Sequence, residues 1–323
     1  MAGFFICFTG SVPLNAFQAI EPDTGFVTKK LTNLYHIQAG EDSLVCTLSA
    51  RLKRQSDGDP VAIGDIVRWN EARQLIEVLP RRNQLARRAA KPMPDSYARE
   101  QVIAANLDQV IPVFAAANPK PAWNLLDRYL VSAESAEIAA LIVLTKFDLV
   151  ERKPEAAEIL SVAAEYRAIG YQVIVTSAET GLGLEQLHAA LFNRLSVFVG
   201  KSGVGKSSLL NALEPGLGLK VQQTSKLTGK GRHTTTHFEM FPLETGGAII
   251  DTPGIREFGL WGVETDNLAL FFPEMRPLVG ACKFGVGCSH DQEPGCAIRR
   301  AVSAGQISPY RYQSYLKLRD EQL

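Results

Sequence analysis

Residues 200–207 read Gly200-Lys201-Ser202-Gly203-Val204-Gly205-Lys206-Ser207 and fit the pattern G-x-x-x-x-G-K-[ST] at every fixed position. The residues just before them, 195–199, predict a buried strand, and Leu209, Leu210 and Leu213 follow at helical spacing. Such a turn points backbone N–H groups and the positive end of a helix at an anion. The stretch therefore predicts an α/β domain with a phosphate-binding loop rather than a plain Gly/Ser-rich turn.

The side chains of this loop indicate how a nucleotide would be held. Lys206 is expected to reach the β- and γ-phosphates and so to take part in catalysis, and the Ser207 hydroxyl is expected to bind Mg²⁺. The loop residues from Gly200 to Gly205 and the following Ser208 complete the predicted phosphate site. A phosphate loop alone does not choose between adenine and guanine, so other motifs must identify the base.

Two motifs that come before this loop in the chain bear on the base. The apolar run 139–144 ends in Thr145-Lys146-Phe147-Asp148, which resembles the N-K-x-D motif of GTPases. The strand-like run 171–176 ends in Ser177-Ala178, which resembles their S-A pair. Either motif alone would also fit the polar end of a strand. Together they favour guanine.

The resemblance implies a role for each residue of these two motifs. Asp148 would accept hydrogen bonds from guanine N1 and N2, and the Lys146 stem would cover the purine ring. The backbone N–H groups of Ser177 and Ala178 would contact guanine O6. Thr145 stands where the motif has Asn, so a hydroxyl replaces one amide contact. We expect this change to affect affinity rather than the choice of base.

Two further stretches fit the mobile elements of a nucleotide switch. Asp251-Thr252-Pro253-Gly254 follows a short apolar strand and matches D-x-x-G. Asp251 would hold Mg²⁺ through a water, and the Gly254 N–H would contact the γ-phosphate. The polar run 230–237 suits the first switch loop, although a plain loop also fits. Thr235 is favoured as a Mg²⁺ ligand, and Thr234 and Thr236 are close alternatives.

Hydrolysis needs a group that orients the attacking water. Ile255 follows D-x-x-G, where many switch GTPases have glutamine, and its side chain cannot bind a water. His233, in the predicted switch loop, can accept a proton near neutral pH and is the candidate catalytic group. A solvated loop histidine fits the position equally well. We expect slow intrinsic hydrolysis that a partner accelerates by ordering the loops.

A cluster of soft ligands near the C-terminus predicts a metal centre. Cys282, Cys288, His290 and Cys296 lie within fifteen residues and match a tetrahedral site for one structural Zn²⁺. A disulfide is disfavoured because the chain has five cysteines, an odd number. Cys7 and Cys46 are expected to be ordinary thiols.

Two predicted helices follow the cluster, at 297–304 and 310–318. The second carries or adjoins basic and aromatic residues that would suit an RNA-facing surface: Arg311, Tyr312, Tyr315, Lys317 and Arg319. A helical pair packed on the zinc site is the alternative.

Residues 25–80 are rich in short β-type runs separated by Gly, Asp and Pro turns, without a helical period. Strands are predicted within 26–37, 43–48, 63–69 and 74–78. Oligonucleotide-binding (OB) and SH3-like barrels both fit. Residues 51–91 are basic, and the pairs Arg81-Arg82 and Arg87-Arg88 could contact phosphates or belong to a solvated loop.

The base-reading motifs precede the phosphate loop, the reverse of the usual order. This permuted order, the run Arg232–Thr236 and the cysteine cluster resemble the bacterial ribosome small-subunit-dependent GTPase A (RsgA) family over about residues 25–320. The resemblance implies an OB barrel, a circularly permuted GTPase domain and a zinc module. It also implies GTP as substrate, and the small ribosomal subunit, with its 16S rRNA and proteins, as partner. Five residues separate Cys282 from Cys288, where the family has four, and Gly285 and Gly287 could absorb the extra one.

The expected organisation is multidomain. We predict an N-terminal arm at 1–20, an all-β OB-like barrel with a basic linker at 21–104, and an α/β P-loop GTPase domain, circularly permuted, at 105–275. A small α-rich zinc-binding helical domain follows at 276–323. The hydrophobic content of 46% is ample for packed cores, and net charge is zero, with the acidic excess in 105–275.

The expected function is that of a GTP hydrolase serving late assembly of the small (30S) ribosomal subunit and binding rRNA through its flanking domains. We expect a cytoplasmic protein because no apolar run approaches 18 residues and residues 4–8 are too short for a secretory signal. Off the ribosome it is expected to be a monomer. Two alternatives are an RNA-binding protein with a vestigial GTPase domain and a small-molecule kinase. The permutation places D-x-x-G close to the zinc cluster in sequence, which suggests that the two are coupled.

Overall fold

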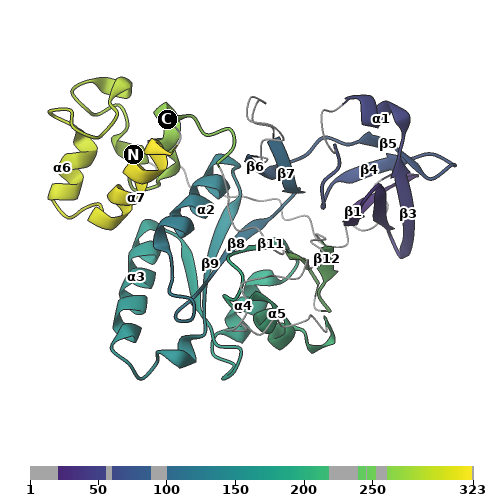
Figure 1. The fold of residues 1–323 in the computed structure, drawn as a ribbon, viewed down its shortest axis with the longest axis horizontal. Coiled ribbons are helices and arrows are strands. Elements are labelled where there is room, and N and C mark those ends of the chain that lie inside the picture. Colours follow the sequence, from purple (N-terminus) through teal and green to yellow (C-terminus); the bar gives the residue numbers. More distant parts are fainter. Residues whose placement is uncertain are drawn as a thin grey trace, which may run out of the picture.

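The computed structural model describes residues 21–55, 60–88, 100–217, 239–244, 246–251 and 260–321. A barrel, a central α/β layer and a C-terminal module lie in a row (Figure 1). The predicted N-terminal arm, Cys7, the switch residues His233 and Thr235, and Gly254 fall outside the described residues. No helix among the described residues has both the length and the apolar character needed to cross a membrane.

The N-terminal unit is a closed five-stranded barrel. Its elements are β1 (Thr24–Leu31), β2 (Leu34–Ala39), β3 (Asp42–Leu48), α1 (Ala50–Gln55), β4 (Ile66–Trp69) and β5 (Gln74–Val78). The strand order is β1-β2-β3-β5-β4, and β4 returns to β1 to close the barrel. Only the β3–β5 pairing is parallel. This order confirms the predicted OB-like fold. The short helix α1 was not predicted, because six residues are too few to show a helical period.

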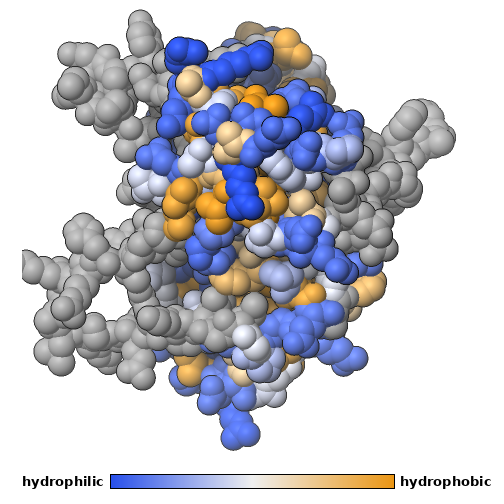
Figure 2. Space-filling view, turned by 90° about the vertical axis from the view of Figure 1, so that its right-hand side faces the viewer, coloured by the Kyte–Doolittle hydropathy of each residue, from blue (hydrophilic) through white to orange (hydrophobic). Residues whose placement is uncertain are grey.

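Alternation along the strands fills the barrel interior. Val27, Ile37 and Leu75 are completely buried there. The side of the molecule that carries the barrel is a mixture of hydrophilic and hydrophobic residues (Figure 2). The large hydrophobic residues that the barrel exposes on its outside are aliphatic: Leu34, Val45 and Ile76. The described barrel therefore presents no large exposed aromatic platform for stacking bases.

The arginines after the barrel connect it to the rest of the molecule. Arg81 holds the buried Asp65 with two hydrogen bonds, Nε to Oδ1 at 2.7 Å and Nη2 to Oδ2 at 2.8 Å. Arg82 donates to Asp108 at 2.7 Å and to two backbone carbonyls. Both guanidinium groups thus bind protein carboxylates, and the Arg82 side chain remains 36% exposed, so its contact with phosphates stays a prediction. Arg87 donates to Gln101 at 2.9 Å across the hairpin of β6 (Gln84–Arg88) and β7 (Glu100–Ala105).

The central layer is a mostly parallel sheet covered on both faces. Its strand order is β10-β9-β8-β11-β13-β12, and all pairings are parallel except β12 with β13. The strands are β8 (Gln109–Ala115), β9 (Ala139–Thr145), β10 (Gln172–Val175), β11 (Leu195–Val199), β12 (Glu239–Pro242) and β13 (Ala248–Asp251). Helices α2 (Trp123–Ser135) and α3 (Glu155–Ile169) share one core with this sheet, and α4 (Leu184–Leu191) and α5 (Lys206–Leu213) share another (Figure 1).

Strand β8 lies at the centre of this sheet. On one side of it are β9 and β10, which end in the base-reading motifs, and on the other are β11 and β13, which end in the phosphate loop and at Asp251. Parallel strands bring all these carboxyl ends to one edge. Ligands of open α/β sheets bind at such an edge, where the strand order reverses direction. The permuted order therefore still assembles one site.

The C-terminal module has little regular structure besides two helices, α6 (Ala297–Ser303) and α7 (Pro309–Asp320). Short 3-10 turns, η4 (Thr265–Phe271), η5 (Arg276–Leu278) and η6 (Gly285–Gly287), precede them. Its core runs from Leu260 to Leu318 and includes three cysteines and Val131 of α2. Residues 260–275 thus pack with the zinc segment.

Helix α7 turns Arg311 and Tyr315 inward, whereas Tyr310 and Lys317 are exposed. Arg311 is 2% exposed, donates to Asp127 of α2, and binds Glu274 at 2.7 and 3.0 Å. Tyr315 is also buried, and its hydroxyl donates to the Ser289 carbonyl at 3.0 Å. The prediction that α7 presents Arg311 and Tyr315 to RNA is wrong. The helical pair packs on the metal cluster and on α2, as the alternative had it.

Candidate nucleotide site and metal centre

The phosphate loop follows β11 and leads directly into α5. Gly203 and Gly205 adopt left-handed backbone angles, with φ of 81° and 98°, which a glycine adopts without strain. A Cβ atom on Gly200 would lie 2.4 Å from the Val113 carbonyl oxygen, so the loop packs against β8 without room for a side chain. Lys201 and Ser202 are exposed at its tip, and Val204 is buried beneath. The glycine pattern is thus explained by local geometry.

Lys206 lies in the first turn of α5 with its side chain folded over the loop. Its Nζ donates to the Gly200 carbonyl at 2.7 Å. Burial lowers the pKa of Lys206, and the nearby Asp251 carboxylate partly offsets this. Asp251 is opposite Phe198 in the parallel β13–β11 register, which brings the carboxylate to the phosphate loop. Ser207 and Ser208 follow in the same turn of α5, half-buried.

Two side chains join the base-reading motif to the phosphate loop. The Lys146 ammonium donates to the Gly203 carbonyl at 2.6 Å and to the Asn118 carbonyl at 2.5 Å. The Thr145 hydroxyl donates to the Val204 carbonyl at 2.5 Å. Burial lowers the pKa of Lys146, while Asp148 opposes the shift. The two halves of the predicted site are therefore in direct contact, although about sixty residues of sequence separate them.

Asp148 is held by the second base-reading motif. The Ser177 hydroxyl donates to Asp148 Oδ1 at 2.6 Å and accepts from the Thr180 N–H at 3.2 Å. The Ser177 N–H donates to the Leu182 carbonyl at 3.0 Å, so this group is already occupied. Of the predicted pair, the Ala178 N–H is left to contact a ligand. The positioning role of the Ser177 hydroxyl was not predicted.

Asn118, after β8, also belongs to this site and was missed. It contributes through its backbone carbonyl, to which Lys146 donates. A backbone acceptor leaves no signal in the amino-acid sequence. The structure thus brings together the described residues of the predicted nucleotide site, whereas His233, Thr235 and Gly254 lie outside the described residues.

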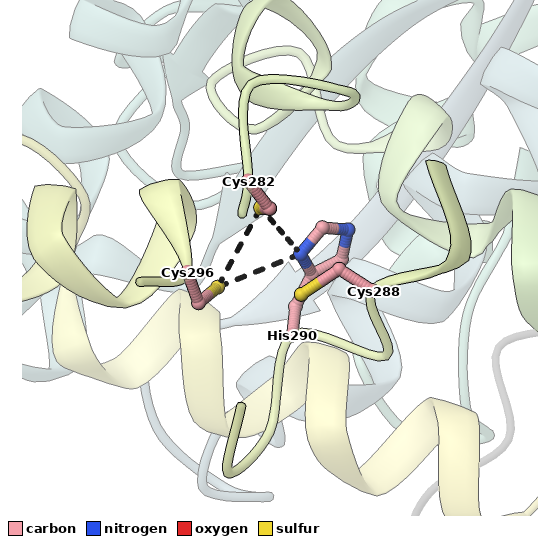
Figure 3. A group of neighbouring side chains, drawn as sticks. All are labelled: Cys282, Cys288, His290 and Cys296. Atoms are coloured by element: carbon pink, nitrogen blue, oxygen red, sulfur yellow. Dashed lines mark hydrogen bonds between the residues drawn. The ribbon is translucent and has the colours of Figure 1, made fainter. Parts of the chain in front are cut away.

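The second site is a cluster of four buried side chains in the C-terminal module (Figure 3). The ligand atoms of Cys282, Cys288, His290 and Cys296 all lie within 4.8 Å of one another. Cys282 Sγ is 3.9 Å from Cys296 Sγ, and His290 Nδ1 is 3.4 and 3.6 Å from these two sulfurs. A tetrahedron with Zn–S bonds of about 2.3 Å has edges of about 3.8 Å. The cluster fits a zinc ion.

The surrounding backbone supports thiolate ligands. The Ala297 N–H donates to Cys282 Sγ at 3.2 Å, and the Arg299 N–H donates to Cys296 Sγ at 3.5 Å. Burial acts to raise the pKa of Cys282, but the Ala297 N–H and the neighbouring thiols outweigh it, so this pKa is lowered. The sulfur separation is far longer than a disulfide bond of about 2.05 Å. Gly285, with a φ of 59°, begins the turn η6 between Cys282 and Cys288.

The fold and the two sites define the class of circularly permuted P-loop GTPases with a barrel and a zinc-type module. The features that define it are the phosphate loop within a parallel sheet, the base-reading motifs on the strands before it, the closed barrel and the three-cysteine, one-histidine cluster. The sequence model of the RsgA GTPase family matches residues 78–261, and the chain belongs to this family.

Relatives and solved structures agree with this assignment. The chain is 45% identical over 306 residues to the small ribosomal subunit biogenesis GTPase RsgA of Gemmatimonas aurantiaca, covering 92% of this chain and 97% of that one. It is 46% identical over 274 residues to the protein of the same name from Pseudomonas aeruginosa, covering 84% and 76%.

Two solved structures share the architecture. YjeQ from Thermotoga maritima matches with a TM-score of 0.73 and 28% identity, over 93% of this chain and 98% of that one. YloQ, described as a circularly permuted GTPase, matches with a TM-score of 0.68 and 31% identity, over 93% and 94%. The predicted permutation and family are confirmed.

Proposed function

We propose that this chain hydrolyses GTP and serves the assembly of the small ribosomal subunit. The observation that carries the proposal is the direct bonding of Thr145 and Lys146 to the phosphate-loop carbonyls, which joins guanine-type motifs and a phosphate loop in one site. The relatives named above are biogenesis GTPases, and this chain spans nearly the whole of the Gemmatimonas protein. No observation favours a vestigial GTPase domain or a kinase.

The nucleotide would be held by the residues of this edge of the sheet. Asp148 would accept from guanine, the Lys146 stem would cover the ring, and the Ala178 N–H would donate to O6. The backbone of residues 200–205 and the Lys206 ammonium would bind the β- and γ-phosphates, with Ser208 beside them. The Lys206 ammonium donates to the Gly200 carbonyl, so its side chain is already directed over the loop.

Magnesium would be held by Ser207 and by Thr235 of the first switch loop, with Asp251 holding it through a water. The chemistry of these donors fits, since hydroxyl and carboxylate oxygens are what Mg²⁺ prefers. The ion would neutralise charge on the β- and γ-phosphates. The influence of Asp251 on the pKa of Lys206 supports its nearness to the phosphate site. Hydrolysis would depend on Mg²⁺.

His233 is the proposed group that orients the attacking water, and the Gly254 N–H is the proposed contact to the γ-phosphate. Ile255 cannot take the role of the glutamine found in many switch GTPases, so intrinsic turnover would be slow. The small subunit would accelerate it by ordering the switch loops. The cycle would end when hydrolysis releases the protein from the subunit.

The flanking units would contact 16S rRNA and ribosomal proteins. Because Arg311 of α7 is buried, the exposed cations of the C-terminal module are Lys283, Arg299, Arg300 and, on α7 itself, Lys317. One structural Zn²⁺ would hold that module in shape. We expect a cytoplasmic protein that is monomeric when not bound to the subunit, which sedimentation would test.

The test is turnover of GTP and ATP by the full chain, with and without purified 30S subunits and with and without Mg²⁺. We expect GTP turnover that 30S subunits stimulate and that Lys206→Ala abolishes. Absence of GTP turnover in every condition would refute the proposed function, and a preference for ATP would revive the kinase interpretation. His233→Ala with full stimulated turnover would show that another group orients the water.

A further inference from the structure

The donor count of Thr145 bears on how guanine is recognised. Its hydroxyl has one proton, and two backbone carbonyl oxygens lie near it, Val204 O at 2.5 Å and Phe114 O at 3.3 Å. The residue is 3% exposed. Whichever carbonyl receives the proton, the hydroxyl offers only lone pairs to anything else. Thr145 therefore has no hydrogen to donate to a bound base.

Guanine presents different chemistry on its two edges. N1 and N2 are donors, which the Asp148 carboxylate can accept, whereas O6 and N7 are acceptors and need an N–H or O–H group. The Ala178 N–H remains for O6. N7 lies beyond O6, toward C8 and the sugar and phosphates. Thr145 stands between the base-reading motif and the phosphate loop, since a Cβ on Gly205 would lie 3.5 Å from its Oγ1.

Lys146 does not supply the missing donor. Its ammonium is directed at the carbonyls of Gly203 and Asn118. Its methylene stem is the part left for the face of the purine, while the N7 lone pair lies in the ring plane. An asparagine at position 145 would differ, because its amide has two N–H donors, one for the Val204 carbonyl and one for N7.

Building on the proposed function, we propose that this chain recognises guanine by its N1, N2 and O6 groups and that neither Thr145 nor Lys146 donates a hydrogen bond to N7, with Thr145 as the residue that sets this specificity. The site therefore takes guanine nucleotides whose N7 is replaced by carbon. The hydrogen bond from the Thr145 hydroxyl to the Val204 carbonyl instead fixes the phosphate loop against β9.

The experiment is equilibrium competition of GTP, 7-deaza-GTP and ITP against a fluorescent GDP on the full chain. For the unchanged protein we expect 7-deaza-GTP to bind within about two-fold of GTP, and ITP, which lacks N2, to bind about ten-fold more weakly. Thr145→Asn should bind GTP more tightly and should bind 7-deaza-GTP about three- to ten-fold more weakly than GTP.

Thr145→Val is the matched control, since it keeps the shape and removes the hydroxyl. It should weaken GTP and 7-deaza-GTP equally, leaving their ratio near one. A ten-fold preference of the unchanged protein for GTP over 7-deaza-GTP would overturn the proposal. So would a Thr145→Asn variant with a ratio near one. Equal binding of ITP and GTP would also overturn it, because the proposal includes recognition of N2. Failure to bind GTP would instead count against the proposed function.

Discussion

The two sites of this protein are built in opposite ways. The metal centre takes all four ligands from residues 282–296 and closes them around one point in a buried core. The nucleotide site draws on segments from Asn118 to Asp251, and five strands must lie in the right order to assemble it. A local site should fail as a unit, whereas a distributed site should lose its contacts one at a time. The expected results below test that difference.

The largest effect is expected at the metal centre. Cys288→Ser should abolish binding of one zinc per chain and unfold the C-terminal core, because apparent zinc affinities of such sites are on the order of 10 kcal/mol. Elemental analysis and limited proteolysis would measure both. Partner-stimulated hydrolysis should suffer more than GTP binding. Cys46→Ser, a buried thiol of the barrel, is the control and should keep its zinc. Partial zinc retention in Cys288→Ser would argue against a unitary site.

The seam between the module and the central layer should give the next largest effect. Arg311→Met leaves Asp127 and Glu274 buried without their cation, which should lower the free energy of unfolding by about 3 to 5 kcal/mol. Denaturant titration of the zinc-loaded protein would measure it. Arg276→Met removes a half-exposed pair with Glu134 from the same seam and should cost less than about 1 kcal/mol. Equal losses would mean that burial does not distinguish the two.

At the nucleotide site, Lys206→Ala should weaken GTP about 10- to 100-fold, because a charge-assisted contact to phosphate is lost while the rest of the site remains. Isothermal titration calorimetry would give the affinity. Lys201→Ala, on the exposed tip of the same loop, is the control and should stay within about two-fold of the unchanged protein. A complete loss of folding in Lys206→Ala would contradict the picture of independent contacts.

The smallest effect is expected for Ser177→Ala. Asp148 loses the hydroxyl that holds Oδ1, so GTP affinity should fall about two- to ten-fold, and the preference for GTP over ITP should fall with it. The same competition assay used for Thr145 would measure this. Ser202→Ala, exposed on the phosphate loop, should change neither quantity. An unchanged GTP to ITP ratio in Ser177→Ala would show that Asp148 keeps its position without help.

The same contrast explains which features were predictable. Residue spacing was enough to predict the metal cluster. The phosphate loop was predictable because its backbone conformation requires glycine at fixed positions. The order of motifs was enough to predict permutation, since strand ends and loops are adjacent in sequence. The closed barrel also followed from short alternating strands, although choosing between OB and SH3-like topologies required the pairing of β3 with β5.

The incorrect predictions concern side chains whose binding partners could not be identified from the sequence. Arg311 looked like a surface cation because Asp127 and Glu274 are distant in sequence, yet the two carboxylates raise its pKa against the effect of burial and keep it charged inside. Arg81 likewise binds a buried carboxylate, that of Asp65, which the sequence pattern did not reveal. Backbone acceptors such as the carbonyls of Asn118 and Val204 carry no sequence signature at all. Their contribution is visible only in the folded structure, where β8 lies between β9 and β11.

The antiparallel strand β12 has a consequence for the whole molecule. It starts at Glu239, just after the predicted first switch loop, and lies between β13, which ends at Asp251, and β1 of the barrel. Glu239 is opposite Lys29 in the ladder and also accepts its ammonium at 2.8 Å. The barrel is therefore joined by backbone pairing to the strand that follows the predicted switch loop. A rotation of β12 would be passed to β1 and hence to the barrel.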